Sequence, residues 1–250
     1  MKLQNKVVII TGGAGGIGAG MGRAMAKEGA IIVAVDVNPE TGAKTADELQ
    51  QISPKSMFVQ ADLTDHANLK NIVEDVVTKY GHLDVLVNNA HASKQVPFLE
   101  TTPENLALSM DTGFYPTWYL MQAAIPHLKE TKGNIINFAS GARLFGNKGQ
   151  CSYAGAKEGI RGLTRVAATE WAADGINVNV VCPLAWTAQL EKFEKTYPEA
   201  FKANVHTPPM GHFGDNEKEI GRVVVQLTSL DFKYMTGETI TLEGGLGMRP

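Results

Sequence analysis

Residues 6–29 read KVVIITGGAGGIGAGMGRAMAKEG, and this stretch decides the fold class. Its first five residues, KVVII (6–10), form an apolar run typical of a strand buried on both faces. A glycine-rich turn follows and opens a helix, with Gly16 and Gly18 at the expected helix start. Such a turn lets a pyrophosphate approach main-chain N–H groups without a Cβ in the way. The stretch predicts a dinucleotide site, and a flexible turn is the alternative.

Apolar runs rich in Val and Ile recur along the chain between segments of helical periodicity. They are IIVAV (31–35), MFVQ (57–60), DVLVN (84–88), NIINF (134–138), INVNVV (176–181) and TITL (239–242). The helical segment after residue 150 carries an apolar face made of Ala156, Ile160, Leu163, Val166, Ala167 and Trp171, with Glu158, Arg161, Arg165 and Glu170 off that face. The alternation predicts an α/β fold: a doubly wound, seven-stranded, mostly parallel sheet with helices on both faces, in one domain over residues 1–250.

The composition of the chain excludes several classes of function. The net charge is −3 and Lys and Arg are scattered, so no basic footprint for nucleic acid is present. The start lacks the pattern of a signal peptide, and no apolar run is long enough to cross a membrane. We therefore expect a cytoplasmic protein with a small-molecule partner, no nucleic acid and no membrane. Cys151 and Cys182 match no zinc or disulfide framework, so we expect buried reduced thiols and no metal.

The end of the second strand indicates which dinucleotide the chain binds. Asp36 stands there, and its carboxylate can accept hydrogen bonds from the adenosine ribose hydroxyls while it repels a 2′-phosphate. Positions 14, 15 and 37 are Ala14, Gly15 and Val37, so no Lys or Arg stands there to neutralise the charge of such a phosphate. These residues predict NAD rather than NADP.

Residues 184–215 interrupt the alternation of strands and helices. A segment of this length in a compact domain is typical of a lid or a binding segment. Its large apolar side chains would either line an apolar substrate pocket, together with Phe145 and Gln150, or form a small core or subunit contact of their own. These side chains are Trp186, Phe193, Tyr197, Phe201, Met210 and Phe213.

The stretch SYAGAK (152–157) places a tyrosine and a lysine four residues apart. Residues at this spacing share one face of a helix, so Lys157 can favour the phenolate form of Tyr153. A tyrosine so activated can act as a general base, and Ser140, at the end of the fifth strand, can hydrogen-bond a substrate oxygen. The alternatives are an exposed surface pair for Tyr153 and Lys157 and a strand-end cap for Ser140.

These motifs together resemble the short-chain dehydrogenase/reductase family over nearly the whole chain. The turn TGGAGGIG (11–18) fits the family pattern TGxxxGxG, and the segments 61–63 (ADL), 88–90 (NNA) and 235–245 (MTGETITLEGG) stand where the family has similar ones. The resemblance implies a Rossmann fold, reversible hydride transfer between nicotinamide and a carbinol carbon, and a homotetramer. It implies that Tyr153, Lys157 and Ser140 are catalytic. It also implies that the cofactor is bound by Gly12, Gly16, Ile17, Gly18, Asp36, Asp62, Leu63, Asn89, Ala90, Tyr153, Lys157, Pro183 and Thr187.

Three positions depart from the family pattern. Gly113 stands where the family has an Asn that accompanies a helix kink, and we expect the kink to persist without that side chain, with Asp111 on another helix face. Leu184 and His91 each replace a family glycine. His91 is either a donor facing the ligand or a packed side chain.

The sequence thus predicts an NAD-dependent oxidoreductase that interconverts a secondary alcohol and a ketone, with Tyr153 as acid and base. Two alternatives remain. One is lyase or epimerase chemistry, in which His91 or Asp111 would serve as a second acid or base. The other is a catalytically silent NAD-binding regulatory protein, which the changes at Gly113, His91 and Leu184 make conceivable. The substrate among polyols, hydroxysteroids and hydroxyacyl compounds is left open.

Overall fold

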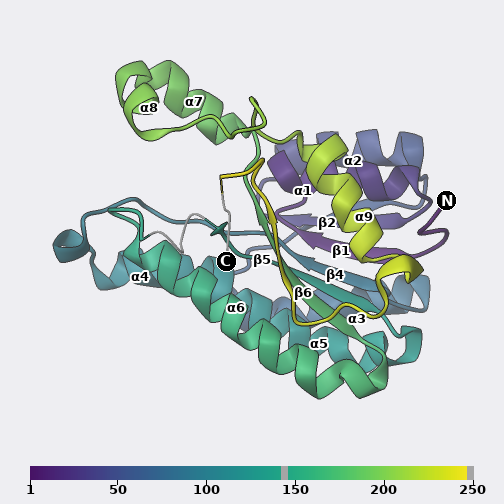
Figure 1. Ribbon diagram of the computed structural model, residues 1–250. Helices are drawn as coiled ribbons and strands as arrows, with labels where there is room; N and C mark the ends of the chain where they lie inside the picture. Colours follow the sequence, from purple (N-terminus) through teal and green to yellow (C-terminus); the bar gives the residue numbers. More distant parts are fainter. Residues whose placement is uncertain (142–145, 247–250) are drawn as a thin grey trace.

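The computed structural model describes residues 1–141 and 146–246 (Figure 1). In this part of the chain one sheet contains the strands β1 (Val7–Thr11), β2 (Ile31–Asp36), β3 (Met57–Gln60), β4 (Val85–Asn88), β5 (Asn134–Phe138), β6 (Asn177–Pro183) and β7 (Thr239–Leu242). Their order is β3-β2-β1-β4-β5-β6-β7, and every pairing is parallel. The predicted doubly wound sheet is confirmed, and it is parallel throughout these strands rather than only mostly parallel.

Helices cover both faces of the sheet (Figure 1). The longer ones are α1 (Gly16–Lys27), α2 (Pro39–Ile52), α3 (Leu69–Tyr80), α5 (Tyr115–Thr131) and α6 (Cys151–Trp171), and the shorter ones are α4 (Pro103–Ser109), α7 (Ala188–Thr196), α8 (Pro198–Asn204) and α9 (Arg222–Leu227). Helices α3, α5 and α6 lie on one face, and α1, α2 and α9 lie on the other. Within the described ranges no helix is both long and apolar enough to cross a bilayer.

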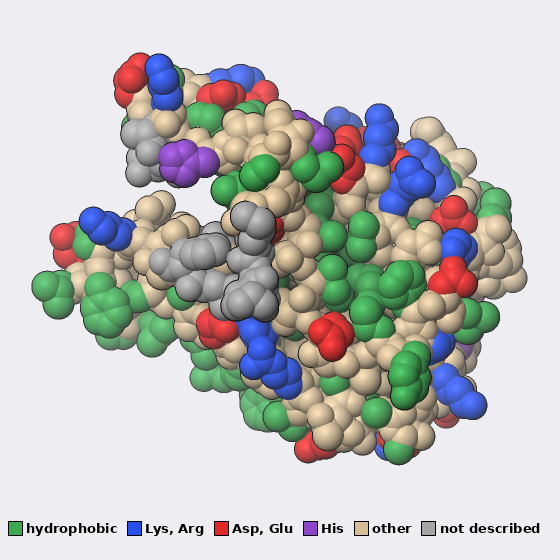
Figure 2. Space-filling view, in the orientation of Figure 1, with side chains coloured by type: hydrophobic (Ala, Val, Ile, Leu, Met, Phe, Trp, Pro, Cys, Tyr) green, Lys and Arg blue, Asp and Glu red, His purple; other side chains and the backbone are tan. Residues whose placement is uncertain are grey.

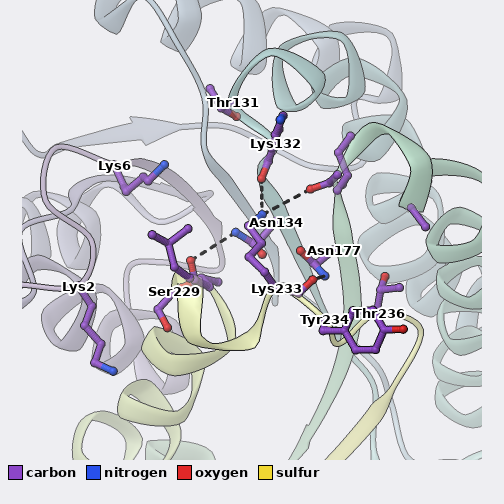
Figure 3. Close-up of a pocket in the computed structure, with 15 residues that line it drawn as sticks. Lys2, Lys6, Thr131, Lys132, Asn134, Asn177, Ser229, Lys233, Tyr234 and Thr236 are labelled. Atoms are coloured by element: carbon purple, nitrogen blue, oxygen red, sulfur yellow. Dashed lines mark hydrogen bonds between the residues drawn. The ribbon is translucent and has the colours of Figure 1, made fainter.

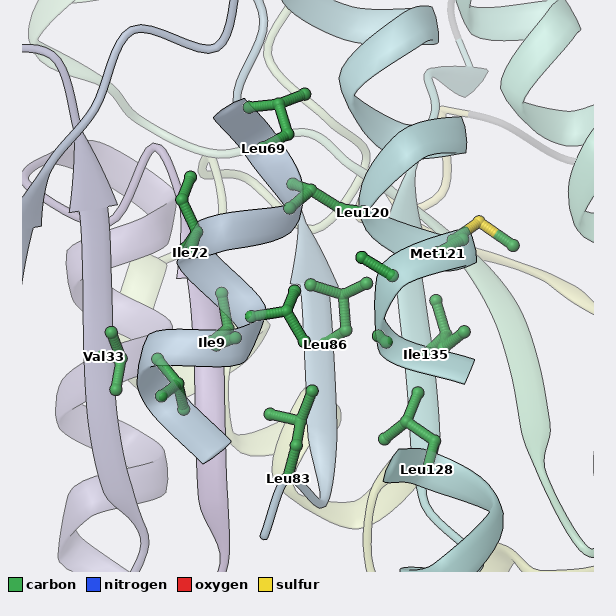
Figure 4. Close-up of a cluster of buried hydrophobic side chains, with 14 of the residues drawn as sticks. Ile9, Val33, Leu69, Ile72, Leu83, Leu86, Leu120, Met121, Leu128 and Ile135 are labelled. Carbon is green, nitrogen blue, oxygen red and sulfur yellow. The ribbon is translucent and has the colours of Figure 1, made fainter. Parts of the chain in front are cut away.

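Two buried clusters hold the layers together, one on each face of the sheet. Side chains of a strand point alternately to its two faces, so Val7 and Ile9 join one cluster while Val8 and Ile10 join the other. Figure 4 shows the first cluster, in which Leu120 and its neighbours on the helices lie against the strands. Burial on both faces is why β1 reads as a continuous apolar run, whereas the edge strands β3 and β7 are only partly buried.

The carboxyl ends of the strands meet at one edge of the sheet. Strand β1 lies between β2 and β4, so consecutive connections run in opposite directions from it. In open α/β sheets, ligands bind outside the carboxyl ends of the strands at such a switch point. The glycine turn follows β1 and Asp36 ends β2, while Asn89 and Ser140 follow β4 and β5. The fold therefore brings most of the predicted site residues to this edge.

The segment 184–215 carries helices α7 and α8, which stand away from the body of the molecule (Figure 1) and overhang a notch in its surface (Figure 2). Its aromatic rings contact one another. The ring centroid of Trp186 lies 6.2 Å from that of Phe201 and 5.5 Å from that of Phe213, and the rings of Phe193 and Phe201 are 6.0 Å apart. These contacts favour the interpretation that the segment has a small core of its own. Phe145 lies outside the described residues.

Helix α6 differs from its predicted pattern at two positions. Val166 was expected on the buried face, but 58% of its surface is exposed. Arg161 was expected off that face, but only 3% of its surface is exposed, because its guanidinium finds partners in the interior that are described below. Of the two cysteines, Cys182 is buried as expected, whereas Cys151 is half-buried, and neither forms a disulfide.

Candidate active site

The glycine turn after β1 needs glycine at the predicted positions. Gly12 and Gly16 have φ values of 64° and 50°, in the left-handed region that favours glycine. A Cβ on Gly18 would lie 2.1 Å from the carbonyl oxygen of Gly12, which no side chain could tolerate. A Cβ on Gly15 or Gly16 would meet no atom within 4 Å, so the turn is open at the start of α1. With Ile17 beside it, this helix N-terminus offers main-chain N–H groups in a cradle that fits a pyrophosphate.

Two carboxylates stand near this turn at the ends of β2 and β3. Asp36 accepts hydrogen bonds from the main-chain N–H of Ala14 at 3.3 Å and from that of Asn38 at 3.2 Å. Asp62 accepts from the main-chain N–H of Thr64 at 2.9 Å and from its hydroxyl at 2.8 Å. The main-chain hydrogen bond from Thr64, followed by that of its hydroxyl, lowers the pKa of Asp62 below its ordinary value. Asp36 is thereby fixed against the glycine turn and Asp62 against the segment after β3.

The segment after β4 is tied to the same turn. The side-chain amide of Asn89 donates to the carbonyl oxygens of Thr11 at 3.0 Å and Gly12 at 3.3 Å. In return, the hydroxyl of Thr11 accepts from the main-chain N–H groups of Asn89 and Ala90 at 3.0 and 3.1 Å. Asn89 and Ala90 therefore lie where the prediction needs them, against the glycine turn, whereas Leu63 is buried in the core beside α3.

Tyr153 and Lys157 lie in the first two turns of α6, and they do not form an exposed surface pair. Lys157 is 3% exposed, and its Nζ donates a 2.7 Å hydrogen bond to the carbonyl oxygen of Phe138 at the end of β5. The same Nζ lies 5.7 Å from the centroid of the Tyr153 ring. Because Lys157 is buried and Tyr153 is half-buried, the alternative of an exposed surface pair is wrong.

Ser140 is supported from behind by a residue that the sequence did not single out. Its carbonyl oxygen accepts a 3.1 Å hydrogen bond from Nη2 of Arg161. The guanidinium also donates to the carboxylate of Glu158 at 3.0 Å and lies 3.7 Å from the sulfur of Cys182. Burial lowers the pKa of Arg161, but the interactions with Glu158 and Cys182 together outweigh burial and raise that pKa above its ordinary value. One signal could have found it: Arg161 lies one helical turn beyond Lys157, on the same face as that lysine.

The helix between α4 and α5 is irregular where the sequence predicted a kink. The turn η3 (Met110–Phe114) is π-helical, wider than an α-helix, and it contains the buried Gly113. The carbonyl oxygen of Asp111 contacts Nε2 of His66 at 3.1 Å. His91 packs its ring edge-on against Tyr153, with ring centroids 4.7 Å apart. This contact favours the packed interpretation of His91.

The two remaining predicted contacts lie where β6 leads into the segment 184–215. Pro183 is the last residue of β6 and pairs with Leu242 of β7. Thr187 precedes α7, and its hydroxyl accepts a 3.2 Å hydrogen bond from the main-chain N–H of Leu190, so it caps that helix. The contact of Thr187 with a nicotinamide stays a prediction.

A pocket of about 750 Å³ lies at the opposite edge of the sheet (Figure 3). Lys6, Asn134 and Asn177 line it at the amino ends of β1, β5 and β6, and Lys132 and Lys233 add positive charge. None of the predicted site residues lines this pocket. The predicted site residues lie instead around the carboxyl edge of the sheet. Among the described residues, no group of His, Cys, Asp or Glu side chains is arranged to hold a metal ion.

Comparison with known proteins agrees with this geometry. Residues 12–247 match a family model described as enoyl-(acyl carrier protein) reductase. The chain is 53% identical over 255 residues to a 12alpha-hydroxysteroid dehydrogenase from a Clostridium species, covering 99% of this chain and 98% of the relative. It is 32% identical over 246 residues to a meso-2,3-butanediol dehydrogenase from Serratia marcescens, covering 98% of this chain and 96% of that protein. Among solved structures, Cj0485 dehydrogenase matches with a TM-score of 0.92 and 29% identity, covering 100% of this chain and 96% of that one.

The chain therefore belongs to the short-chain dehydrogenase/reductase family, and it is an oxidoreductase. The relatives lend no support to the lyase, epimerase or regulatory alternatives, because they are named as dehydrogenases and reductases.

Proposed function

We propose that this short-chain dehydrogenase/reductase oxidises a secondary alcohol of the hydroxysteroid class to the ketone with NAD, and catalyses the reverse reaction. The observation that carries the chemistry is the buried Nζ of Lys157, hydrogen-bonded to the carbonyl oxygen of Phe138 and 5.7 Å from the ring of Tyr153. The relative that is 53% identical over nearly the whole chain supports the substrate class.

The residues of the chain divide the work as follows. Tyr153, as phenolate beside the Lys157 ammonium, takes the proton of the substrate hydroxyl, and in the reverse direction it returns that proton. The hydroxyl of Ser140 hydrogen-bonds the same substrate oxygen and stabilises the charge that develops on it. A bound nicotinamide cofactor would supply the acceptor for the hydride of the carbinol carbon. The alcohol thus loses one proton to Tyr153 and one hydride to the cofactor, which balances the oxidation to a ketone.

The cofactor preference rests on Asp36. Its carboxylate is fixed by Ala14 and Asn38 at the end of β2, beside the glycine turn. A ribose with free hydroxyls would donate to this carboxylate, whereas a 2′-phosphate would be repelled by it. We therefore favour NAD over NADP. The open glycine turn supports the predicted cofactor contacts of its three glycines, Gly12, Gly16 and Gly18. The hydrogen bonds of Asn89 and Ala90 to the Thr11 hydroxyl support the predicted contacts of those two residues.

A lid and a subunit contact complete the proposal. The segment 184–215 overhangs the notch at the carboxyl edge (Figure 2), which suits a lid that closes over an apolar substrate. Exposed apolar side chains also occur just before α4, at Phe98 and Leu99, and on α4, α5 and α6, at Leu106, Trp118 and Val166. Apolar patches of this kind suit a subunit contact, in line with a homotetramer.

The experiment is a screen of secondary alcohols, hydroxysteroids among them, with NAD and with NADP, following the absorbance of the reduced cofactor. We expect NAD-dependent turnover of a hydroxysteroid. Tyr153→Phe should lose about 10²–10⁴-fold in kcat, the usual contribution of a general acid and base, while NAD affinity changes little. Tyr234→Phe, a fully exposed tyrosine on the opposite edge of the sheet, is the matched control.

Each outcome has a distinct meaning. Tight NAD binding without turnover on a broad panel would favour the regulatory protein over the dehydrogenase. Full activity of Tyr153→Phe would contradict the proposed mechanism, whichever substrate is used. Turnover of small diols but no hydroxysteroid would retain the mechanism and refute the substrate class.

A further inference from the structure

The imidazole of His91 lies directly on the main chain of Gly113 in η3. A Cβ built on Gly113 would come 2.2 Å from Nδ1 of His91 and 2.7 Å from its Cε1. Packed atoms do not approach so closely, so any side chain at position 113 would exclude the ring from this place. The backbone at Gly113 does not itself require glycine, because its φ is not in the left-handed region. Glycine is needed at position 113 to make room for the imidazole of His91.

The same ring also contacts Tyr153, the proposed acid and base. The rings of His91 and Tyr153 are 4.7 Å apart at an angle of 82°, which is the edge-to-face arrangement that aromatic pairs prefer. Both ring nitrogens of His91 are buried. The main chain just before His91 is anchored by the bonds of Asn89 and Ala90 to Thr11. The imidazole thus packs against both η3 and α6, and the main chain that carries it is held in place.

We propose that His91 is a positioning residue that holds the ring of Tyr153 in its reactive orientation, and that Gly113 is present to admit it. Lys157 approaches the tyrosine ring from within α6, and the imidazole approaches it from outside that helix. The two contacts together restrict the rotation of the phenol, which must point its hydroxyl at the substrate. The inference rests on the proposed role of Tyr153, but the contact between His91 and Gly113 does not.

The contact itself is tested by stability in two backgrounds. Gly113→Ala in the otherwise unchanged enzyme should lower the melting temperature, because the new methyl group displaces the imidazole. In a His91→Ala background the same change should raise it, because alanine favours a helix over glycine once the space is empty. Gly162→Ala is the matched control, since Gly162 is exposed on α6 and a Cβ there meets no atom within 4 Å. An equal effect of Gly113→Ala in both backgrounds would refute the contact.

The positioning role is tested by kinetics on the same variants. His91→Ala should lower kcat about tenfold or more, because small displacements of a reacting group are costly, while the KM for NAD stays within about twofold. His91→Phe keeps a flat ring in this place and should restore most of kcat. Gly113→Ala should lower kcat as His91→Ala does, although it leaves the histidine in the sequence.

The outcomes separate this inference from the proposed function. Wild-type kcat in His91→Ala would overturn the positioning role, and so would a His91→Phe variant as slow as His91→Ala. Full activity of Tyr153→Phe would instead overturn the role of the tyrosine, and the melting temperatures would still report whether His91 and Gly113 form a pair.

Discussion

Replacement of Arg161 by methionine tests whether the support behind Ser140 stabilises the fold and the site. The methionine keeps an apolar stem of similar length but removes the guanidinium. The carbonyl oxygen of Ser140 then loses its 3.1 Å donor, a charge-assisted bond worth about 1.5–3 kcal/mol. The bond to Glu158, whose side chain is exposed, adds about 0.2–1 kcal/mol. The sum is about 2–4 kcal/mol, which for a chain of this size lowers the melting temperature by roughly 4–16 °C.

The assay compares urea and thermal unfolding with turnover at matched protein concentrations. Arg165→Met is the control, because Arg165 lies one turn further along α6 with its side chain exposed, where substitutions change stability by about 0.5 kcal/mol or less. We expect Arg161→Met to lower kcat about tenfold or more through displacement of Ser140, with NAD affinity nearly unchanged. If Arg161→Met is no less stable than Arg165→Met, the contact with Ser140 contributes nothing. If it is less stable but equally fast, the contact supports only the fold.

Three further predictions concern the cofactor site and the edge of the lid. Asp36→Ala should weaken the binding of NAD about tenfold or more. It should also reduce the preference of the enzyme for NAD over NADP, measured as the ratio of kcat/KM with the two cofactors. Gly18→Ala should lower the affinity for NAD at least about fivefold in a binding titration, because the new Cβ would lie 2.1 Å from the Gly12 carbonyl oxygen. An unchanged affinity would contradict the geometry of the turn. The hydrogen bond from His212 to the Glu219 carboxylate, followed by the one to the Met210 carbonyl oxygen, raises the pKa of His212 above its ordinary value of 6.5. The ion pair therefore contributes its full stability below pH 6.5. That contribution is lost as the pH rises through the raised pKa. An NMR titration of His212 should show this, and Glu219→Gln should return it toward the ordinary value.

The strands and the glycine turn could be predicted because local chemistry determines them. Runs such as KVVII (6–10) and IIVAV (31–35) match β1 and β2, whose residues 7–11 and 31–35 are all buried, because a strand covered on both faces is apolar along most of its length. The turn itself requires its glycines. Gly12 and Gly16 have a left-handed φ, and a Cβ on Gly18 would collide with the carbonyl oxygen of Gly12 in the same turn. Such requirements can be seen in a short stretch of sequence.

Contacts between distant elements could not be predicted in this way. Arg161 is charged, so helical periodicity placed it on the surface, and only the positions of Ser140 and Cys182 at the ends of neighbouring strands explain its burial. The sequence shows separately that His91 and Gly113 depart from the family pattern. It does not show that the two residues touch, because that contact depends on how the fold brings the segment after β4 against η3.

The proposed catalytic groups are held mainly through bonds to the main chain. Three side chains that hold the site each bond the main chain at a strand end: Asn89 bonds Thr11, Lys157 bonds Phe138 and Arg161 bonds Ser140. Main-chain carbonyl oxygens cannot be removed by substitution, and they move only if the sheet moves. The positions of Lys157 and Ser140 are therefore tied to the main chain at the end of β5. That leaves the ring of Tyr153 as the group whose orientation still depends on side-chain packing, and His91 packs against it.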